Sequence, residues 1–114
     1  MLHPPTPGSP GHAHWASHCR AAAGLLTLEF DARYAHAQVD AFVDALRRFG
    51  IGWSWGGPMS LAVPYRPQAL RGAGTAYRGG LVRLCIGLED VADLIADLEQ
   101  AMATLPDLGV RSPT

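Results

Sequence analysis

The chain has 114 residues, of which 48% are hydrophobic and 17% are charged, and its formal net charge is −1. This length suits one small domain, and a charge so close to zero gives no reason to expect nucleic acid or a membrane surface as a partner. No apolar run approaches the ~20 residues that span a bilayer. The two cysteines, Cys19 and Cys85, do not suggest a disulfide framework, so we predict a cytoplasmic protein.

Residues 1–20 are predicted to be a lead-in segment rich in proline and histidine. Its first eleven residues hold four prolines and show no apolar periodicity, which disfavours both helix and sheet. His12, His14 and His18 follow, and the last two could share one helical face. Apart from Cys19, no acid or cysteine stands close enough to complete a metal-binding set, so we favour a solvated helical segment over a metal site.

The first predicted strand covers residues 24–31, where apolar side chains alternate. One of its faces would carry Leu26, Leu28 and Phe30. The first predicted helix covers residues 34–50, and its apolar stripe consists of Val39, Phe42, Val43 and Leu46. Gly50 stands where a C-terminal cap is expected, and Arg47 and Arg48 would complement the helix dipole in the last turn.

Residues 50–64 are not typical of a packed strand or helix, because they contain four glycines, two tryptophans and two serines. Pairs of glycines let a backbone approach a ligand or another chain closely. Two interpretations remain open. The segment is either a binding loop, in which Ser54 stands between Trp53 and Trp55, or a turn whose tryptophans pack in the core.

The second predicted strand covers residues 81–86. Val82, Leu84 and Ile86 fall on one of its faces, and Arg83 lies in the middle of the other. Periodicity alone therefore places Arg83 on the solvent side of a half-exposed strand.

A capped amphipathic helix is predicted after this strand. Gly87 breaks the strand, Glu89 or Asp90 can cap the helix, and Asp93 can reinforce its first turn. The apolar stripe of this helix is expected at Val91, Leu94, Ile95, Leu98, Met102 and Leu105.

This order of elements predicts an α+β fold, in which helices pack on one face of a small, mostly antiparallel sheet. All nine basic residues are arginine, and the chain contains no lysine. The chain by itself therefore cannot form an internal Schiff base.

Three segments resemble the C-terminal region of the cystathionine β-lyase family, which belongs to the Cys/Met-metabolism pyridoxal-phosphate (PLP) enzymes of fold type I. They are SWGG at residues 54–57, SLAVP at 60–64 and GGLVRLCIGLEDVADLIADLEQA at 79–101. The N-terminal LHPPTPGSPGHAHW is similar to the segment that leads into the family's C-terminal domain. The resemblance implies a C-terminal small domain at residues 21–106, preceded by the lead-in of residues 1–20 and followed by a tail at 107–114.

The resemblance also implies a site for the substrate. In that family the arginine of the VRL strand pairs with the α-carboxylate of the substrate, and Arg83 occupies its position. A guanidinium suits this task because its planar fork grips a carboxylate through two parallel bonds. Ser54 and Trp55 inherit places in the same pocket, and Trp55 favours the β-lyase branch. Pro58 and Met59 depart from the family pattern, which usually has an aromatic and an acidic residue there.

By the same resemblance, the parent enzyme binds PLP, acts on a sulfur amino acid such as cystathionine and forms a homo-tetramer. The Schiff-base lysine and the phosphate-binding loop belong to the family's N-terminal large domain. We therefore expect this chain to contribute no catalytic and no cofactor-binding residue, and to be inactive alone. The alternative is a non-catalytic domain that binds a small acid or another protein.

Overall fold

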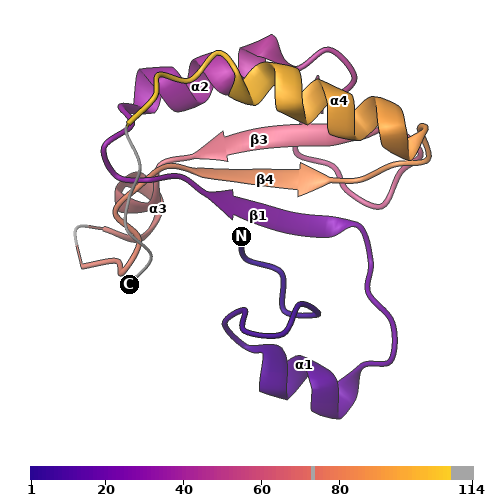
Figure 1. Cartoon of the computed structure of the whole chain (residues 1–114). Coiled ribbons are helices and arrows are strands. Elements are labelled where there is room, and N and C mark those ends of the chain that lie inside the picture. The colour runs from indigo at the N-terminus through magenta and orange to yellow at the C-terminus, as the bar shows by residue number, and fades with distance from the viewer. Residues whose placement is uncertain (73, 109–114) are drawn as a thin grey trace.

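The computed structural model describes residues 1–72 and 74–108, which form a sheet with helices around it (Figure 1). In chain order the elements are α1 (His12–His18), β1 (Leu25–Glu29), α2 (His36–Ala45), β2 (Gly50–Ile51), β3 (Leu61–Tyr65), α3 (Pro67–Arg71), β4 (Leu81–Cys85) and α4 (Val91–Met102). The strand order is β1-β4-β3-β2. Strand β4 is antiparallel to both of its neighbours and β2 is parallel to β3, so the expected mostly antiparallel sheet is confirmed.

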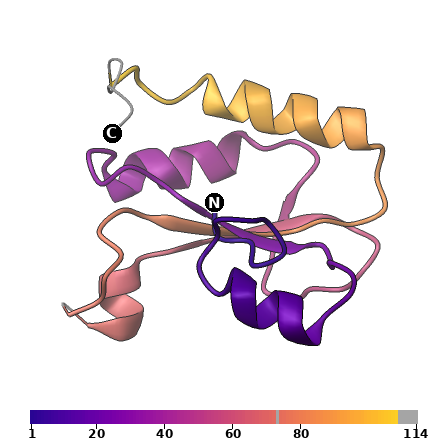
Figure 2. The same ribbon diagram turned by 60° about the horizontal axis from the view of Figure 1, so that its bottom comes forward.

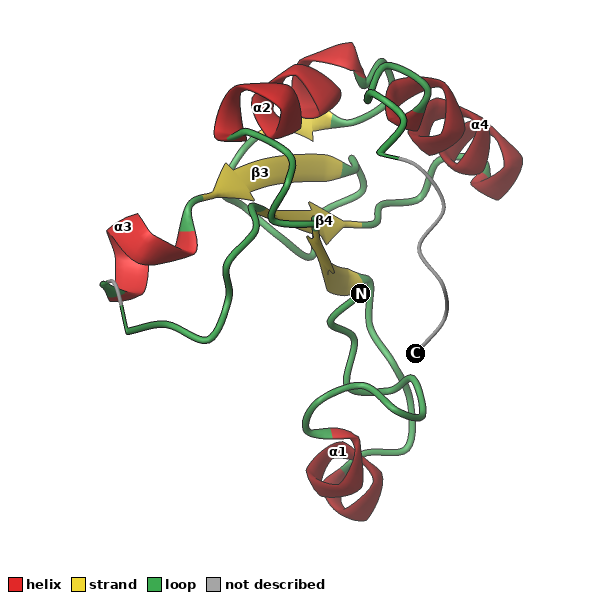
Figure 3. Cartoon of the chain, turned by 60° about the vertical axis from the view of Figure 1, so that its left-hand side comes forward, coloured by secondary structure: helices red, strands yellow, loops and turns green. Residues whose placement is uncertain are grey.

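The two long helices, α2 and α4, cover the same face of the sheet, as the α+β prediction requires (Figure 1). Helix α1 lies on the other side of the sheet, where the predicted helical segment of the lead-in is observed (Figure 2). Figure 3 shows that α1 stands apart from the sheet and that α3 sits near one end of it. The second face of the sheet, which we call the open face, is therefore not covered by α2 and α4.

The register of the strands decides which side chains share a face. Leu84 of β4 pairs with Leu26 of β1 and with Ala62 of β3, and all three face the long helices. The core between sheet and helices consists of Phe30, Val39, Phe42, Val43, Leu46, Phe49, Ala62, Val82, Leu84, Leu94 and Ala101. The stripe predicted for the first helix is thus buried as expected.

Helix α2 ends at Ala45, so the predicted continuation to Gly50 is wrong. The backbone N–H groups of Arg47 and Arg48 donate to the Asp97 carboxylate of α4, at 2.9 and 2.6 Å. These bonds replace the contacts that another helical turn would make, and they leave both arginines outside the helix. Gly50 is therefore the first residue of β2 and not a C-terminal cap.

Helix α4 begins as predicted, and half of its predicted stripe faces the core, since Leu94 is buried and Leu98 and Leu105 pack against the core cluster. The Asp90 carboxylate caps it by accepting the backbone N–H of Asp93 at 3.2 Å. Its buried residues are Leu94, Asp97 and Ala101. Three residues of the predicted stripe, Val91, Ile95 and Met102, are exposed. The contact face is shifted to one side of the predicted stripe, because the small Ala101 and the hydrogen-bonded Asp97 also face the core and α2.

Residues 61–65 form strand β3, and they correct the prediction that residues 50–64 contain no packed strand. Ala62 and Val63 are buried. Pro64 is tolerated in this inner strand because its nitrogen points toward β2, which pairs only with Leu61 and Ala62. Among the described residues, that side of β3 has no ladder partner beyond Ala62, so the missing N–H of Pro64 breaks no ladder bond there.

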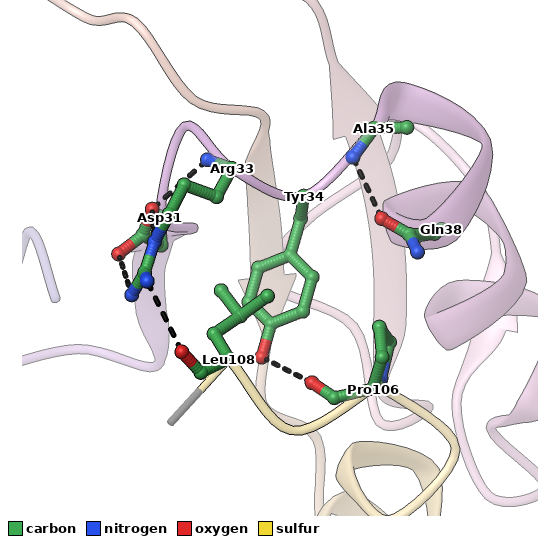
Figure 4. A network of polar contacts seen from close by, with 7 residues as sticks. All are labelled: Asp31, Arg33, Tyr34, Ala35, Gln38, Pro106 and Leu108. Atoms are coloured by element: carbon green, nitrogen blue, oxygen red, sulfur yellow. Dashed lines mark hydrogen bonds and ion pairs between the residues drawn. The ribbon is translucent and has the colours of Figure 1, made fainter. Parts of the chain in front are cut away.

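The segment that follows α4 is fastened to the start of α2 (Figure 4). The Tyr34 hydroxyl donates to the Pro106 carbonyl oxygen at 3.1 Å, and the Arg33 guanidinium donates to the Leu108 carbonyl oxygen at 3.1 Å. The Asp31 carboxylate orients Arg33 by accepting hydrogen bonds from the backbone N–H and from the guanidinium of Arg33. The chain therefore packs against the fold up to Leu108, inside the segment predicted as a tail.

Both cysteines are free thiols, Cys19 exposed and Cys85 buried. Within the described residues, no helix is long and apolar enough to cross a membrane. A cytoplasmic location stays a prediction, as do the boundaries of the lead-in, the small domain and the tail.

Candidate functional site

Arg83 lies at the centre of the open face. It pairs with Thr27 of β1 and with Val63 of β3, so its side chain leaves the sheet opposite the packed helices. The side chain is half-buried. A strand whose other face is occupied by Val82 and Leu84 cannot turn this guanidinium into the core, and the strand period therefore fixes the side of the sheet on which it acts.

Two groups hold the Arg83 guanidinium. Its Nη2 donates a hydrogen bond to the Trp53 backbone carbonyl oxygen. Its Cζ lies 5.9 Å from the centre of the Tyr65 ring, within the range of a cation–π contact. Trp53 itself packs edge-to-face on Tyr65, with ring centres 5.4 Å apart. The guanidinium is thus directed by one carbonyl and one aromatic face.

The predicted substrate residues Ser54 and Trp55 lie in an exposed loop next to this contact. We call residues 52–60 the tryptophan loop. The side chains of Trp53 and Trp55 are 69% and 68% exposed, so the interpretation in which both tryptophans pack in the core is wrong. Ser54 is exposed as well. The structure brings the loop to Arg83 through Trp53, the direct sequence neighbour of Ser54.

The tryptophan loop is anchored by its backbone, although residues 53–59 are exposed. The Gly56 N–H donates to the Cys85 sulfur at 3.2 Å. The Pro58 carbonyl oxygen accepts the Leu88 N–H at 2.8 Å. Together with the bond between Arg83 and Trp53, these contacts fasten the loop to β4 and to the residues directly after it.

The C-terminal end of the loop is held by a buried serine and a carboxylate. Ser60 is fully buried, and both its N–H and its hydroxyl donate to the two carboxylate oxygens of Glu89, each at 2.8 Å. The Ser60 hydroxyl oxygen in turn accepts the Gly87 N–H at 2.8 Å. The donated bonds, first that from the Ser60 N–H, hold the pKa of Glu89 below its ordinary value.

A small apolar cavity adjoins the loop. Its volume is about 240 Å³, and its walls are formed by Ala23, Gly24, Leu25, Trp55, Gly56, Cys85 and Ile86. Trp55 therefore covers the part of β4 that lies beyond Arg83. The cavity and the guanidinium lie on the same open face, because Cys85 and Arg83 are two residues apart in one strand.

The histidines of the lead-in are not gathered into a metal centre. His14 and His18 lie on α1, where the His18 ring bonds to the His14 carbonyl oxygen at 2.9 Å. In the described part of the chain, no group of three or more His, Cys, Asp or Glu residues could hold a metal ion.

Sequence reasoning missed the groups that support Arg83 and the loop. The sequence pattern does not distinguish Tyr65, and it indicates for Glu89 only the role of a helix cap. Ser60 lies 29 residues before Glu89, and no local spacing rule joins two such positions. Pro58 and Met59, the departures in the loop, are exposed, and Pro58 contributes a backbone oxygen to the anchoring.

Comparison with known proteins places the chain in one family. The family model described as Cys/Met metabolism PLP-dependent enzyme matches residues 1–103. The L-alanine/L-glutamate racemase of Wolbachia pipientis wMel is 36% identical over 98% of this chain. The cystathionine beta-lyase of Bordetella avium is 45% identical over 90% of this chain. The crystal structure of metB from Corynebacterium glutamicum matches with a TM-score of 0.71 and 29% identity over 89% of this chain.

The match is almost complete for this chain and partial for its relatives. It covers 28% of the Wolbachia racemase, 26% of the Bordetella lyase and 26% of the Corynebacterium structure, so the chain spans about a quarter of their length. The likeness in structure confirms the fold class expected from the resemblance. The chain therefore belongs to the family of Cys/Met-metabolism PLP-dependent enzymes.

Proposed function

We propose that the chain is the part of a PLP-dependent carbon–sulfur lyase that recognises the α-carboxylate of a sulfur amino acid such as cystathionine. The observation that carries this proposal is Arg83, a half-buried guanidinium on the open face that is oriented by the Trp53 carbonyl and the Tyr65 ring. One hydrogen bond from Nη2 leaves further N–H donors of the planar fork for a carboxylate.

In this proposal each site residue has a defined task. Arg83 binds the carboxylate through two parallel bonds and so fixes the orientation of the substrate. Ser54 offers a hydroxyl at the edge of the same pocket, and Trp55 supplies a flat wall that excludes water. None of the three transfers a proton or attacks the substrate, so the chain binds and orients.

The family's cofactor is PLP, which when bound supplies an electron sink for amino-acid chemistry. The residues of this chain do not fit the task of holding it, since a Schiff base requires a lysine and the chain has none. We infer that the cofactor is held by a large catalytic domain against which the open face packs, and that the complete enzyme is a homo-tetramer like its family.

The names of the relatives support the carboxylate as the common element. A racemase of alanine and glutamate and a lyase of cystathionine break different bonds, yet both act on α-amino acids. A segment shared by both suits recognition of the group that the substrates share. The carbon–sulfur lyase is the preferred activity, because the Bordetella lyase has 45% identity and because Trp55 favours the β-lyase branch.

A second candidate is a non-catalytic domain that binds a small acid or another protein. The exposed Trp53, Trp55 and Met59 are compatible with a surface that other protein covers. The two candidates differ in whether the chain completes a catalytic domain, and this can be measured directly.

The test joins the chain to the catalytic three-quarters of the Bordetella lyase in place of that enzyme's own segment. Thiol release from cystathionine by this chimera is expected. Arg83→Lys keeps the charge but loses the fork, so KM should rise about tenfold, the equivalent of one charge-assisted hydrogen bond, with kcat little changed.

Arg71→Lys, at an exposed position of α3, is the matched control and should leave KM unchanged. An unchanged KM in Arg83→Lys would overturn the proposed role of Arg83. A folded chimera without thiol release, whose isolated chain nevertheless binds small carboxylic acids, would favour the second candidate.

A further inference from the structure

The tryptophan loop is held along its length by residues 83–89, through Trp53 and Gly56 near its start and through Pro58 and Ser60 toward its end. Arg83 of β4 holds the Trp53 carbonyl near the start of the loop, and Glu89 holds Ser60 at its end. Between these points the side chains of Ser54 and Trp55 are largely exposed, and Trp55 contributes one wall of the apolar cavity. The position of the loop therefore depends on its backbone anchors.

We propose that Glu89 is a positioning residue, which fixes the tryptophan loop beside Arg83 and thereby sets the affinity of the site for the substrate carboxylate. The inference rests on the proposed function of Arg83 and deepens it. Glu89 touches neither substrate nor cofactor in this account, and it acts through Ser60.

The burial of Ser60 makes the carboxylate necessary. The N–H and the hydroxyl of Ser60 both donate to the Glu89 carboxylate, and Ser60 is 0% exposed. Removal of the carboxylate therefore leaves two buried donors without an acceptor. Buried unpaired polar groups destabilise the fold. Ser60, which directly precedes β3, could then satisfy its N–H and hydroxyl only by moving into water. Such a movement carries the loop away from β4.

The contact between the loop and the turn after β4 is too close to absorb a shift. A Cβ placed on Gly87 would overlap the Pro58 carbonyl oxygen and would lie 2.7 Å from the Met59 carbonyl carbon. The Leu88 N–H donates to the same Pro58 oxygen at 2.8 Å. A displacement of residues 87–89 therefore displaces the loop, which also supplies the Trp53 carbonyl that directs Arg83.

The first test follows the indole N–H signals of the isotope-labelled full chain by NMR. In Glu89→Ala, the signals of Trp53 and Trp55 should shift and broaden, and the amides of Gly56 and Leu88 should exchange with solvent about tenfold faster. The Trp15 signal, which comes from α1, serves as the internal reference and should stay in place.

Glu99→Ala, an exposed acid of α4, is the control and should change none of these signals. If Glu89→Ala prevents folding, Glu89→Gln keeps the shape and one acceptor oxygen, and it should move the same two indole signals by a smaller amount. Unmoved Trp53 and Trp55 signals in a folded Glu89 variant would overturn the proposal.

The second test separates this proposal from the function on which it rests. In the chimera, Glu89→Ala should raise KM about tenfold with kcat little changed, and Glu89→Gln should lie between it and the unmodified chain. A KM that responds to Arg83→Lys but not to Glu89→Ala refutes the positioning role alone. A KM that responds to neither variant refutes the proposed function.

Discussion

Asp97 is a buried acid with 4% exposure that organises the end of another helix. Its carboxylate accepts the backbone N–H groups of Arg47 and Arg48 and the side-chain amide of Gln100. Gln100 also donates to the Ala45 carbonyl oxygen at 2.6 Å, so two neighbouring side chains of α4 serve the C-terminal end of α2. Removal of the Asp97 or Gln100 side chain should therefore destabilise both α2 and α4.

Asp97→Asn should lower the free energy of unfolding by about 2 kcal/mol, because an amide nitrogen then faces backbone donors in a buried place. Urea unfolding of the full chain should show a lower midpoint with an unchanged slope. Glu99→Gln, on the exposed side of the same helix, should stay within about 0.5 kcal/mol. Equal midpoints for the two variants would contradict this account of Asp97.

The same residue predicts how stability depends on pH. Burial raises the pKa of the Asp97 carboxyl, but the N–H groups of Arg48 and Arg47 and the Gln100 amide outweigh it and hold the pKa below its ordinary value. The stabilisation is present above the unfolded-state pKa of about 3.9 and is lost as pH falls through the lowered folded-state value. The difference between the native chain and Asp97→Asn should therefore shrink in acid.

At the scale of elements, the passage from the loop after α3 into β4 depends on a glycine. Gly79 is buried, and a Cβ at this position would overlap the Phe30 carbonyl oxygen where the chain leaves β1. The neighbouring Gly80 carbonyl oxygen accepts the Phe30 N–H at 2.9 Å, so the two backbones cannot separate without loss of a bond.

Gly79→Ala should lower the free energy of unfolding by about 2 kcal/mol or more, and with it the thermal midpoint, since either the β1–β4 pairing or the Phe30 backbone must shift. Gly57→Ala is the matched control, because a Cβ there meets nothing within 4 Å. Thermal unfolding of both variants measures the difference. A Gly79→Ala chain as stable as Gly57→Ala would show that this crossing is more adaptable than its geometry indicates.

The elements whose burial follows a local period could be predicted from the sequence. Val39, Phe42 and Val43 of α2 and Val82 and Leu84 of β4 are buried where periodicity placed them, and Arg83 lies on the opposite face. Hydrophobic periodicity reflects contacts with one neighbouring layer only. It therefore predicts which face of each strand and of α2 is buried.

The features that failed or were missed depend on partners far away in the sequence. The end of α2 is set by Asp97, about 50 residues later, which no capping rule could supply. Helix α4 turned Ala101 and Asp97 inward in place of Val91 and Ile95 for the same reason. The assignment of Ser54, Trp55 and Arg83 to a substrate stays a prediction.

At the scale of the molecule, one side of the sheet is packed and the other carries exposed tryptophans. If the open face packs against a catalytic domain, Trp53 and Trp55 should lose solvent contact on assembly. In a Trp15→Phe background, acrylamide should quench the fluorescence of the chain alone strongly and that of the chimera clearly less. Equal quenching in both states would indicate that the open face stays in water after assembly.

Pro64 has a consequence for how the chain can meet others. An unpaired strand edge is a template on which a second chain can add a strand, and such addition leads to aggregation. Here the outer edge of β1 is occupied at Thr27 by the backbone of Leu2, and the part of β3 beyond Ala62 offers proline in place of a donor. The sheet is therefore poorly suited to grow sideways, and a partner must approach it face-on.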